Sequence, residues 1–199
     1  MSKQLIISVG RQYGSAGHVV AEELAKRFQI DFFNSNLLDE YAKKYKIPLE
    51  SLHKYDEKLA PSFFNRTVHG YSASPAANVA QLQFKLLREL AEEGKSFVIL
   101  GRCSEDVLRK YSCMVSIFIT ANDEEKLMRS VDVNDLQHEK ALAKIHSEDE
   151  KRRKYHDSYC KGKWGDANNY DIVINASLLG VEKTADILEE YIRARMKFM

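Results

Sequence analysis

The stretch "IISVGRQYGSAGHVVAEELAKRF", Ile6 to Phe28, decides the fold. A β-branched apolar run ends at Gly10 and passes through a turn into a helical pattern. The turn contains four residues with small side chains, Gly14, Ser15, Ala16 and Gly17. Small side chains at the start of a helix are typical of a phosphate-binding loop, because the first helical amides have no partner and the helix dipole favours an anion.

The turn lacks the cation of the complete phosphate-loop pattern. That pattern, Gly-x-x-x-x-Gly-Lys-Ser/Thr, uses the Lys to reach the outer phosphates and the hydroxyl to hold Mg²⁺. Here His18 follows Gly17, and Val19 stands where the hydroxyl belongs. By itself the stretch is compatible with a cradle that has lost its function, a cradle that works in another way, and a tight turn with no ligand.

Apolar segments and helical patterns alternate along the rest of the chain. The strand candidates cover residues 4–9, 30–33, 96–101, 114–120 and 170–175. The helix candidates cover residues 18–28, 36–46, 77–94, 122–131 and 180–196. Because the strands are apolar on both faces and helices separate them, we predict an α/β fold, with a five-stranded parallel sheet between two helical layers.

Two segments lack this regularity. The periodicity fades between residues 48 and 75, and residues 132–163 carry many charges and few large apolar side chains. We expect the second of these segments to be helical in part and to bury little. In the first helix, Val19, Val20, Leu24 and Phe28 are expected to form the buried stripe.

Composition excludes several functional classes. With 44% hydrophobic and 30% charged residues in 199, the chain reads as one globular domain. A formal charge of +1 gives no global attraction to nucleic acid, so any anion binding must be local. No apolar run approaches the roughly 18 residues of a membrane span, and the first apolar run is too short for a signal peptide. The odd number of cysteines, 3, favours a reducing compartment, and we expect a cytoplasmic protein.

Most of the chain resembles the cytidylate kinase-like family, a branch of the nucleoside monophosphate kinases. The resemblance rests on "SVGRQYGSAGHVVAEELAKRF", "QLQFKLLRELAEEGKSFVILGRC", "VSIFITANDEEKLMR" and "WGDANNYDIVINASLLGVE". These segments match nearly all of the family's Gly-Arg-Gln-x-Gly-Ser-Gly-Gly loop, its Gly-Arg after a central strand, and its Trp-Gly-Asp before a Tyr-Asp strand that ends in Asn-Thr. The departures are Ala16 for one Gly, His18 in the slot after the loop, and "NAS" for Asn-Thr. The match excludes only about residues 46–76. The absence of the Lys is then a trait of the family.

The resemblance implies one P-loop kinase-like domain over 1–199, with a core (1–47, 94–131 and 164–199), an acceptor-side insertion (about 48–93) and a lid (about 132–163). It implies ATP and Mg²⁺ as cofactors, a nucleoside triphosphate donor and a nucleoside monophosphate acceptor, with cytidylate or another pyrimidine nucleotide as the first to test. A non-catalytic nucleotide- or phosphate-binding protein of the same fold is the alternative. A small-molecule kinase with another acceptor is a more distant one. The sequence is silent on oligomeric state.

The donor phosphates would bind at the glycine turn. Arg11 and His18 are the nearest candidates to replace the Lys; an Arg can fork two phosphate oxygens, whereas a neutral His donates one hydrogen bond. Helix-capping and surface roles for both residues remain open. The candidate cofactor-binding residues are Arg11, Gly14, Ser15, Ala16, Gly17, His18 and Val19.

The acceptor candidates are Arg102, Asn34 and Gln83. Arg102 matches the family's Gly-Arg and ends an apolar strand, where either a ligand or a structural ion pair would satisfy its charge. Asn34 and Gln83 could each contact a base edge or a ribose hydroxyl, or could be solvated. Cys103 stands where the true cytidylate kinases have Asp, which leaves pyrimidine recognition open. Arg66 is a weaker candidate for the acceptor phosphate.

The catalytic candidates are lid cations: Arg129, Arg152 and Arg153, with Lys151 beside them. The segment "DEKRRKYHDSY" is similar to the family's Asp-x-x-Arg-x-x-Tyr helix, and a closing lid requires cations. The alternative is a solvated face on which these side chains pair with the acids at 148–150.

We expect no metal site formed by His138, His146, His156 and Cys160, and we interpret them as surface residues, because their spacing suggests no shared helical face. Trp164 is expected to pack the return from the lid against the core.

Overall fold

The computed structural model describes residues 3–34, 37, 39, 42–43, 46, 67–68, 71–72, 75–134 and 138–198. Most of the helix expected over 36–46, and Arg66, lie outside the described residues. Among the helices that the structure describes, none has the length and hydropathy that crossing a membrane requires.

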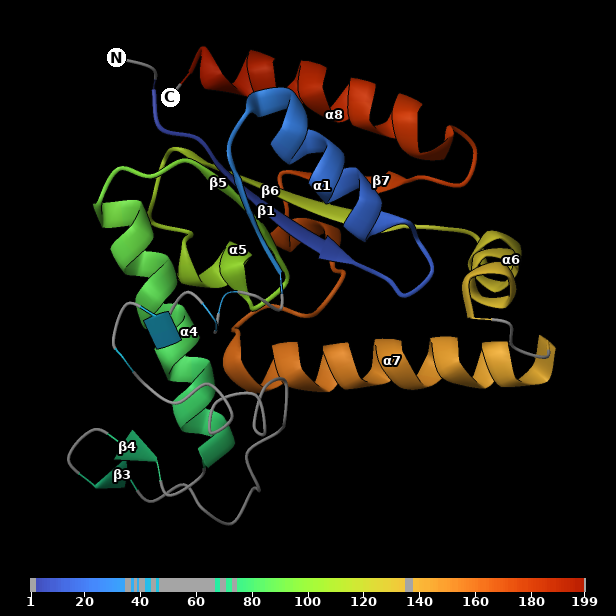
Figure 1. Ribbon diagram of the computed structural model, residues 1–199, viewed down its shortest axis with the longest axis horizontal. Helices are drawn as coiled ribbons and strands as arrows, with labels where there is room; N and C mark the ends of the chain where they lie inside the picture. Colours follow the sequence, from blue (N-terminus) through green and yellow to red (C-terminus); the bar gives the residue numbers. More distant parts are fainter. Residues whose placement is uncertain are drawn as a thin grey trace.

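A five-stranded, all-parallel sheet forms the centre of the molecule (Figure 1). Its strands are β1 (Ile6–Arg11), β2 (Asp31–Phe33), β5 (Phe97–Leu100), β6 (Met114–Thr120) and β7 (Ile172–Asn175), in the order β2-β5-β1-β6-β7. All five predicted strands and the α/β fold are confirmed. A separate antiparallel pair consists of β3 (Thr67–Val68) and β4 (Tyr71–Ser72).

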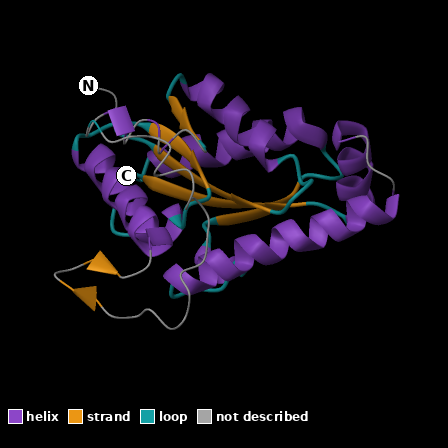
Figure 2. Ribbon diagram, turned by 60° about the horizontal axis from the view of Figure 1, so that its bottom comes forward, coloured by secondary structure: helices purple, strands orange, loops and turns teal. Residues whose placement is uncertain are grey.

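Helices cover both faces of the sheet (Figure 2). One face carries α1 (Gly17–Phe28) and α8 (Gly180–Met196), and the other carries α4 (Pro75–Glu92) and the short α5 (Ser104–Val107). In chain order, α6 (Asp123–Asn134) precedes the long helix α7 (His138–Tyr159). Helix α7 passes close to the turn that follows β1 (Figure 1). The 3₁₀ turn η2 (Ala167–Asn169) leads from α7 toward β7.

The side chains of β1 alternate between the two helical layers. Ile7 and Val9 pack with Val20 and Leu24 of α1, whereas Ile6 belongs to the cluster that α4 forms on the opposite face. Successive residues of a strand point to opposite faces, so a strand covered on both sides is apolar throughout. The strand order places β1 at the centre of the sheet, and the glycine turn begins at its end.

The expected stripe of α1 is wrong at one position. Val20 and Leu24 are fully buried, but Val19 is 51% exposed. Val19 precedes Val20 directly, so its side chain is rotated about 100° away from the stripe. Its position on the open side of the first helical turn places it on the wall of a cavity.

The expectation that residues 132–163 bury little is also wrong. The buried residues of α7 are Ala141, Ile145, Asp149, Tyr155 and His156. His138 and His146 are exposed as expected, but His156 is only 5% exposed and is no surface residue. The buried face of α7 is apolar in its first half and largely polar in its second, which is why hydrophobic periodicity does not reveal it.

Gly10 permits a close approach between β1 and an aromatic cluster. A Cβ on Gly10 would lie 2.6 Å from Cδ2 of Phe118. The Phe118 ring in turn meets Trp164 edge-on, with centroids 5.3 Å apart, and lies 5.0 Å from Tyr170. Trp164 thus packs the chain returning from α7 against the sheet.

We expect Gly10→Ala to displace Phe118 and destabilise the protein by about 1 to 3 kcal/mol, because the added methyl group overpacks the core. Trp164 is the single tryptophan of the sequence, so its fluorescence should shift as the ring loses its contact. The free energy of unfolding in urea and the emission spectrum measure the two effects.

Gly94→Ala is the control, since nothing lies within 4 Å of its Cβ position although its φ of +74° is strained for alanine. It should lower stability without changing the Trp164 emission. An unchanged Trp164 spectrum in folded Gly10→Ala protein would contradict the proposed packing.

Candidate active site

The glycine turn is held by its own hydrogen bonds. Gly14 and Ala16 have φ of 74° and 61°, in the left-handed region. Ser15 Oγ donates to the carbonyl of Gln12 at 2.8 Å and accepts the N–H of Gly17 at 3.3 Å. A Cβ on Gly14 would lie 2.9 Å from the carbonyl oxygen of Lys126, so α6 packs directly on the turn. The turn delivers the chain into α1, whose first N–H groups have no carbonyl within the helix to bond.

The Arg11 side chain runs between two glycines. A Cβ on Gly17 would lie 2.5 Å from the Arg11 Cβ, and a Cβ on Gly101 would lie 2.5 Å from the Arg11 Nη1. The guanidinium group of Arg11 therefore reaches from the first turn of α1 to the carboxyl end of β5. The two glycines provide the space for this path.

The turn after β5 is strained. Gly101, Arg102 and Cys103 have successive φ values of 77°, 60° and 55°. A non-glycine residue in this region costs about 1 to 3 kcal/mol, and such strain gathers at functional sites. Ser104 Oγ stabilises the turn: it donates to the carbonyl of Gly101 at 2.7 Å and lies 2.6 Å from Ser8 Oγ. Arg102, which is 7% exposed, extends from this strained turn. Its side chain lines the same cavity as the side chain of Arg11.

Helix α7 is docked on the glycine turn. The Asp149 carboxylate accepts the N–H of Tyr13 at 2.6 Å. Arg152 Nη1 lies 3.8 Å from the Asp149 carboxylate and donates to the carbonyl of Arg11 at 3.5 Å. Burial raises the pKa of Asp149, while the Tyr13 N–H and the charge of Arg152 oppose that rise. One turn of α7 therefore brings a carboxylate and a cation to the end of β1.

A first cavity, of about 430 Å³, opens at the glycine turn. Its lining comprises Arg11, Gln12, Tyr13, Gly14, Ala16, Gly17, His18, Val19, Arg129, Ser130, Arg152 and Val181. Nη1 of Arg129 is buried and has no hydrogen-bond partner among the described residues, and a phosphate oxygen would supply one. The cavity fits phosphates. It offers no carboxylate among its described lining, so its residues supply no direct acidic ligand for Mg²⁺.

A second cavity, of about 380 Å³, lies on the other side of Arg11. Its lining comprises Gly10, Arg11, Gly101, Arg102, Cys103, Glu105, Glu148, Lys151, Arg152, Tyr155, His156, Trp164 and Tyr170. Arg11 and Arg152 line both cavities. Cations and aromatic rings together suit a ligand with an anionic group and a flat ring.

His156 and Glu105 form a buried pair on the wall of the second cavity. His156 Nε2 lies 2.7 Å from Glu105 Oε1, and the two side chains are 7% and 3% exposed. Burial lowers the pKa of His156, but hydrogen bonds with Cys160 and Glu105 outweigh it and raise the pKa to about 10. In this arrangement the imidazole is charged at neutral pH and joins the end of α7 to α5.

Of the remaining sequence candidates, Arg153, Gln83 and Asn34 line neither cavity, and His18 lines the first cavity but is exposed. Arg153 is 51% exposed and pairs with Glu150 at 2.6 Å. Gln83 is 1% exposed and accepts a hydrogen bond of 3.3 Å from the Tyr155 hydroxyl. Asn34 follows β2 and lines neither cavity. His18, at the first cavity, is exposed, and its ring meets Phe32 edge-on at 5.5 Å.

Sequence reasoning gave no role in the site to Tyr13, Glu105, Asp149 or His156, which the structure brings there. Asp149 and Arg152 are the Asp and the Arg of the Asp-x-x-Arg-x-x-Tyr pattern that "DEKRRKYHDSY" resembles, and at this spacing they lie on one face of a helix, so the sequence carried a signal for Asp149. The contact of Asp149 with Tyr13 spans 136 residues of sequence and leaves no local pattern.

The comparisons with known proteins agree with this architecture. The model of the cytidylate kinase-like family matches residues 6–178. An uncharacterized protein from Eubacterium ventriosum ATCC 27560, known from a crystal structure, is 32% identical with a TM-score of 0.77, and the alignment covers 96% of this chain and 99% of that one. A search of curated protein sequences found no match.

More distant solved structures share the fold. Shikimate kinase from Bacteroides thetaiotaomicron is 12% identical with a TM-score of 0.56, over 95% of this chain and 98% of that one. Shikimate kinase from Acinetobacter baumannii, in complex with shikimate, is 14% identical with a TM-score of 0.51, over 97% of this chain and 94% of that one. At this identity the likeness shows a P-loop kinase-like fold.

We expect Asp149→Ala to destabilise the protein by about 1 to 3 kcal/mol, because it leaves the Tyr13 N–H without its acceptor. Hydrogen exchange at the Tyr13 amide should accelerate, and urea unfolding gives the free energy. Glu150→Ala is the control: its ion pairs with Arg153 and Lys154 are largely exposed, so it should change stability by less than about 0.5 kcal/mol. Equal effects of the two variants would contradict docking through Asp149.

Proposed function

The chain belongs to the cytidylate kinase-like family, and from this premise we propose that it is an ATP-dependent nucleoside monophosphate kinase-like phosphotransferase, with cytidylate or another pyrimidine nucleotide as the first acceptor to test. The observation that carries the proposal is the pair of cavities that share Arg11 and Arg152. Phosphoryl transfer requires a donor and an acceptor in line, with cations where the charge develops between them. Two cations on a wall that both cavities share support the proposal, because they lie where that charge would develop.

In this proposal the first cavity holds the donor. Backbone amides at the start of α1 and the Arg129 guanidinium bind the phosphates of ATP. Arg11 replaces the absent Lys, because its guanidinium lies beside the turn and can fork two phosphate oxygens. Mg²⁺ would enter with the phosphates of the nucleotide, where it neutralises their charge.

The second cavity holds the acceptor. Arg102, Lys151 and the two shared arginines supply positive charge for a phosphate, and Tyr155 and Trp164 supply aromatic surface for a base. Gln83 acts through Tyr155, because its side-chain oxygen accepts a hydrogen bond from the Tyr155 hydroxyl.

The three cysteines are free, which supports a reducing compartment such as the cytoplasm.

In our proposal the segment 132–163 acts as the lid through α7. Arg152 reaches both cavities, so we assign the lid's catalytic cation to Arg152 and not to the exposed Arg153. Closure of α7 would exclude water from the transfer site.

A non-catalytic nucleotide-binding protein of the same fold is the second candidate. Val19 at the position of the metal-holding hydroxyl, and the absence of a carboxylate from the described lining of the first cavity, favour it. Loss of contacts that strengthen in the transition state lowers activity more than ground-state binding.

The deciding experiment incubates the protein with ATP, Mg²⁺ and a panel of nucleoside monophosphates and measures ADP. We expect turnover, with a pyrimidine nucleotide among the substrates. Tight ATP binding by calorimetry without turnover on any acceptor would leave the binding role and exclude the kinase. Absence of both would exclude both.

We expect Arg152→Ala to lower kcat by roughly 100- to 1000-fold, as the loss of a preorganised transition-state contact does. Arg11→Ala should also weaken ATP binding, and unchanged ATP affinity would show that Arg11 does not replace the Lys. Steady-state kinetics and calorimetry give the two quantities.

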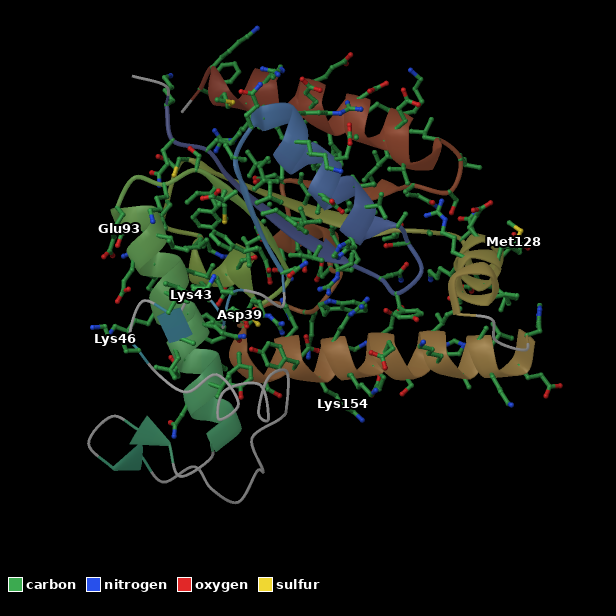
Figure 3. The ribbon with its side chains drawn as sticks, in the orientation of Figure 1. Asp39, Lys43, Lys46, Glu93, Met128 and Lys154 are labelled. Carbon is green, nitrogen blue, oxygen red and sulfur yellow. The ribbon has the colours of Figure 1, made fainter. Side chains whose placement is uncertain are left out.

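Lys154→Ala is the matched control on the same helix. Lys154 is 58% exposed, pairs with Glu150, and projects from α7 away from the sheet (Figure 3). The Lys154→Ala substitution removes one cation from α7 at a position that lines neither cavity. The kcat of this variant should therefore stay near that of the wild type. Equal losses in the two variants would mean that the general charge of α7, and not the position of Arg152, matters.

A further inference from the structure

Three side chains with metal-binding atoms meet at the edge of the second cavity, and Cys103 lies beside them. Glu105, His156 and Cys160 place a ligand atom each within 4.8 Å of one another. The pKa of the Cys160 thiol is raised, and the neighbouring Cys103 thiol is the largest cause. Cys103 and Glu105 come from the turn after β5 and from α5, whereas His156 and Cys160 come from the end of α7. Two distant segments thus bring two thiols, an imidazole and a carboxylate together.

The end of α7 presents its two groups on one face. The N–H of Cys160 donates to the carbonyl of His156 at 2.8 Å, so helical geometry continues through Cys160. Residues four apart lie above one another on a helix. Three residues between two ligands on a helix is also a spacing of structural zinc sites. The expectation that His156 and Cys160 share no helical face is therefore wrong.

A carboxylate orients the His156 ring. Asp157 Oδ1 lies 3.1 Å from His156 Nδ1 and accepts the N–H of Trp164 at 2.9 Å. Metal-binding histidines commonly donate one ring N–H to a carboxylate, which fixes the tautomer. Without a metal ion Nε2 carries the proton that faces Glu105, 2.7 Å away; an ion that replaces this proton would meet the Nε2 lone pair beside the Glu105 carboxylate.

We propose that Glu105, His156 and Cys160, with the adjacent Cys103 moving in as the fourth ligand, bind a divalent transition-metal ion, of which Zn²⁺ fits the ligands best. Thiolates and imidazole select Zn²⁺ over the hard Mg²⁺ that accompanies nucleotide phosphates. Four such groups satisfy the tetrahedral preference of zinc. The ion takes the place of the protons on both thiols and of the imidazole proton that faces Glu105, so its binding releases protons.

The metal-free alternatives explain only parts of the cluster. An ion pair accounts for His156 and Glu105 but gives the two thiols no role. A disulfide between Cys103 and Cys160 accounts for the thiols but not for the imidazole or the carboxylate beside them. A metal ion uses all four groups, and it fastens the end of α7 to the turn that carries Arg102.

The test uses the full chain, stripped with a chelator, kept reduced and titrated with Co²⁺. We expect one equivalent to bind, with the thiolate charge-transfer and d–d absorption of four-coordinate cobalt, and Zn²⁺ to abolish both signals by displacement. Cys160→Ser and His156→Gln should each weaken Co²⁺ binding by about 10-fold or more. Because the readout is a spectrum, it is independent of any kinase activity.

Cys113→Ser is the control, since Cys113 lies outside the cluster and its thiol donates to Gln4. It should leave the spectrum unchanged. If Cys160→Ser fails to fold by circular dichroism, Cys103→Ser replaces it. Absence of a thiolate band in the reduced wild type would overturn the proposal, as would a band that survives in folded Cys160→Ser protein. A mass lower by two hydrogens in unreduced protein, together with no metal binding after reduction, would assign the thiols to a disulfide instead.

Discussion

The path of the Arg11 side chain between Gly17 and Gly101 is the constraint on which the site depends. A side chain at either glycine would meet Arg11 at 2.5 Å. Because Arg11 ends the central strand of the sheet, its guanidinium lies where the turns after β1 and β5 meet. The same group then separates the two cavities and borders both. A glycine in a phosphate loop usually lets phosphate oxygens come close to the backbone. Here Gly17 also leaves the space that the Arg11 side chain occupies.

The fold could be predicted because the sheet is buried on both faces. Residues such as Ile7 and Phe97, fully buried in adjacent strands, produce continuous apolar runs that the sequence displays directly. The loop was predictable for a similar reason, since its glycines and its place after a strand are local features. Val19 shows the limit: a helical stripe drawn one residue too wide includes a side chain that is 51% exposed.

The site was less predictable because its helix buries polar groups. Asp149, Arg152 and His156 recur every three or four residues on α7, as an apolar stripe would. A buried carboxylate or imidazole is favourable only where a partner meets it, and the partners Tyr13 and Glu105 come from other parts of the chain. A hydropathy pattern therefore predicts that this face of α7 is exposed to solvent. The information lies in tertiary contacts that no window of sequence contains.

The absence of the loop Lys changes how binding and structure are coupled. A Lys within the loop stays with the phosphates whatever the rest of the protein does. In this chain one cation comes from β1, and another, Arg152, comes from α7, which the Asp149 carboxylate holds to the Tyr13 N–H. Because Arg152 lines both cavities, a displacement of α7 away from the glycine turn would withdraw this cation from both at once. The positive charge at the junction of the cavities therefore depends on the position of a helix, and an anion that binds there favours the docked helix by the same free energy with which the docked helix favours the anion.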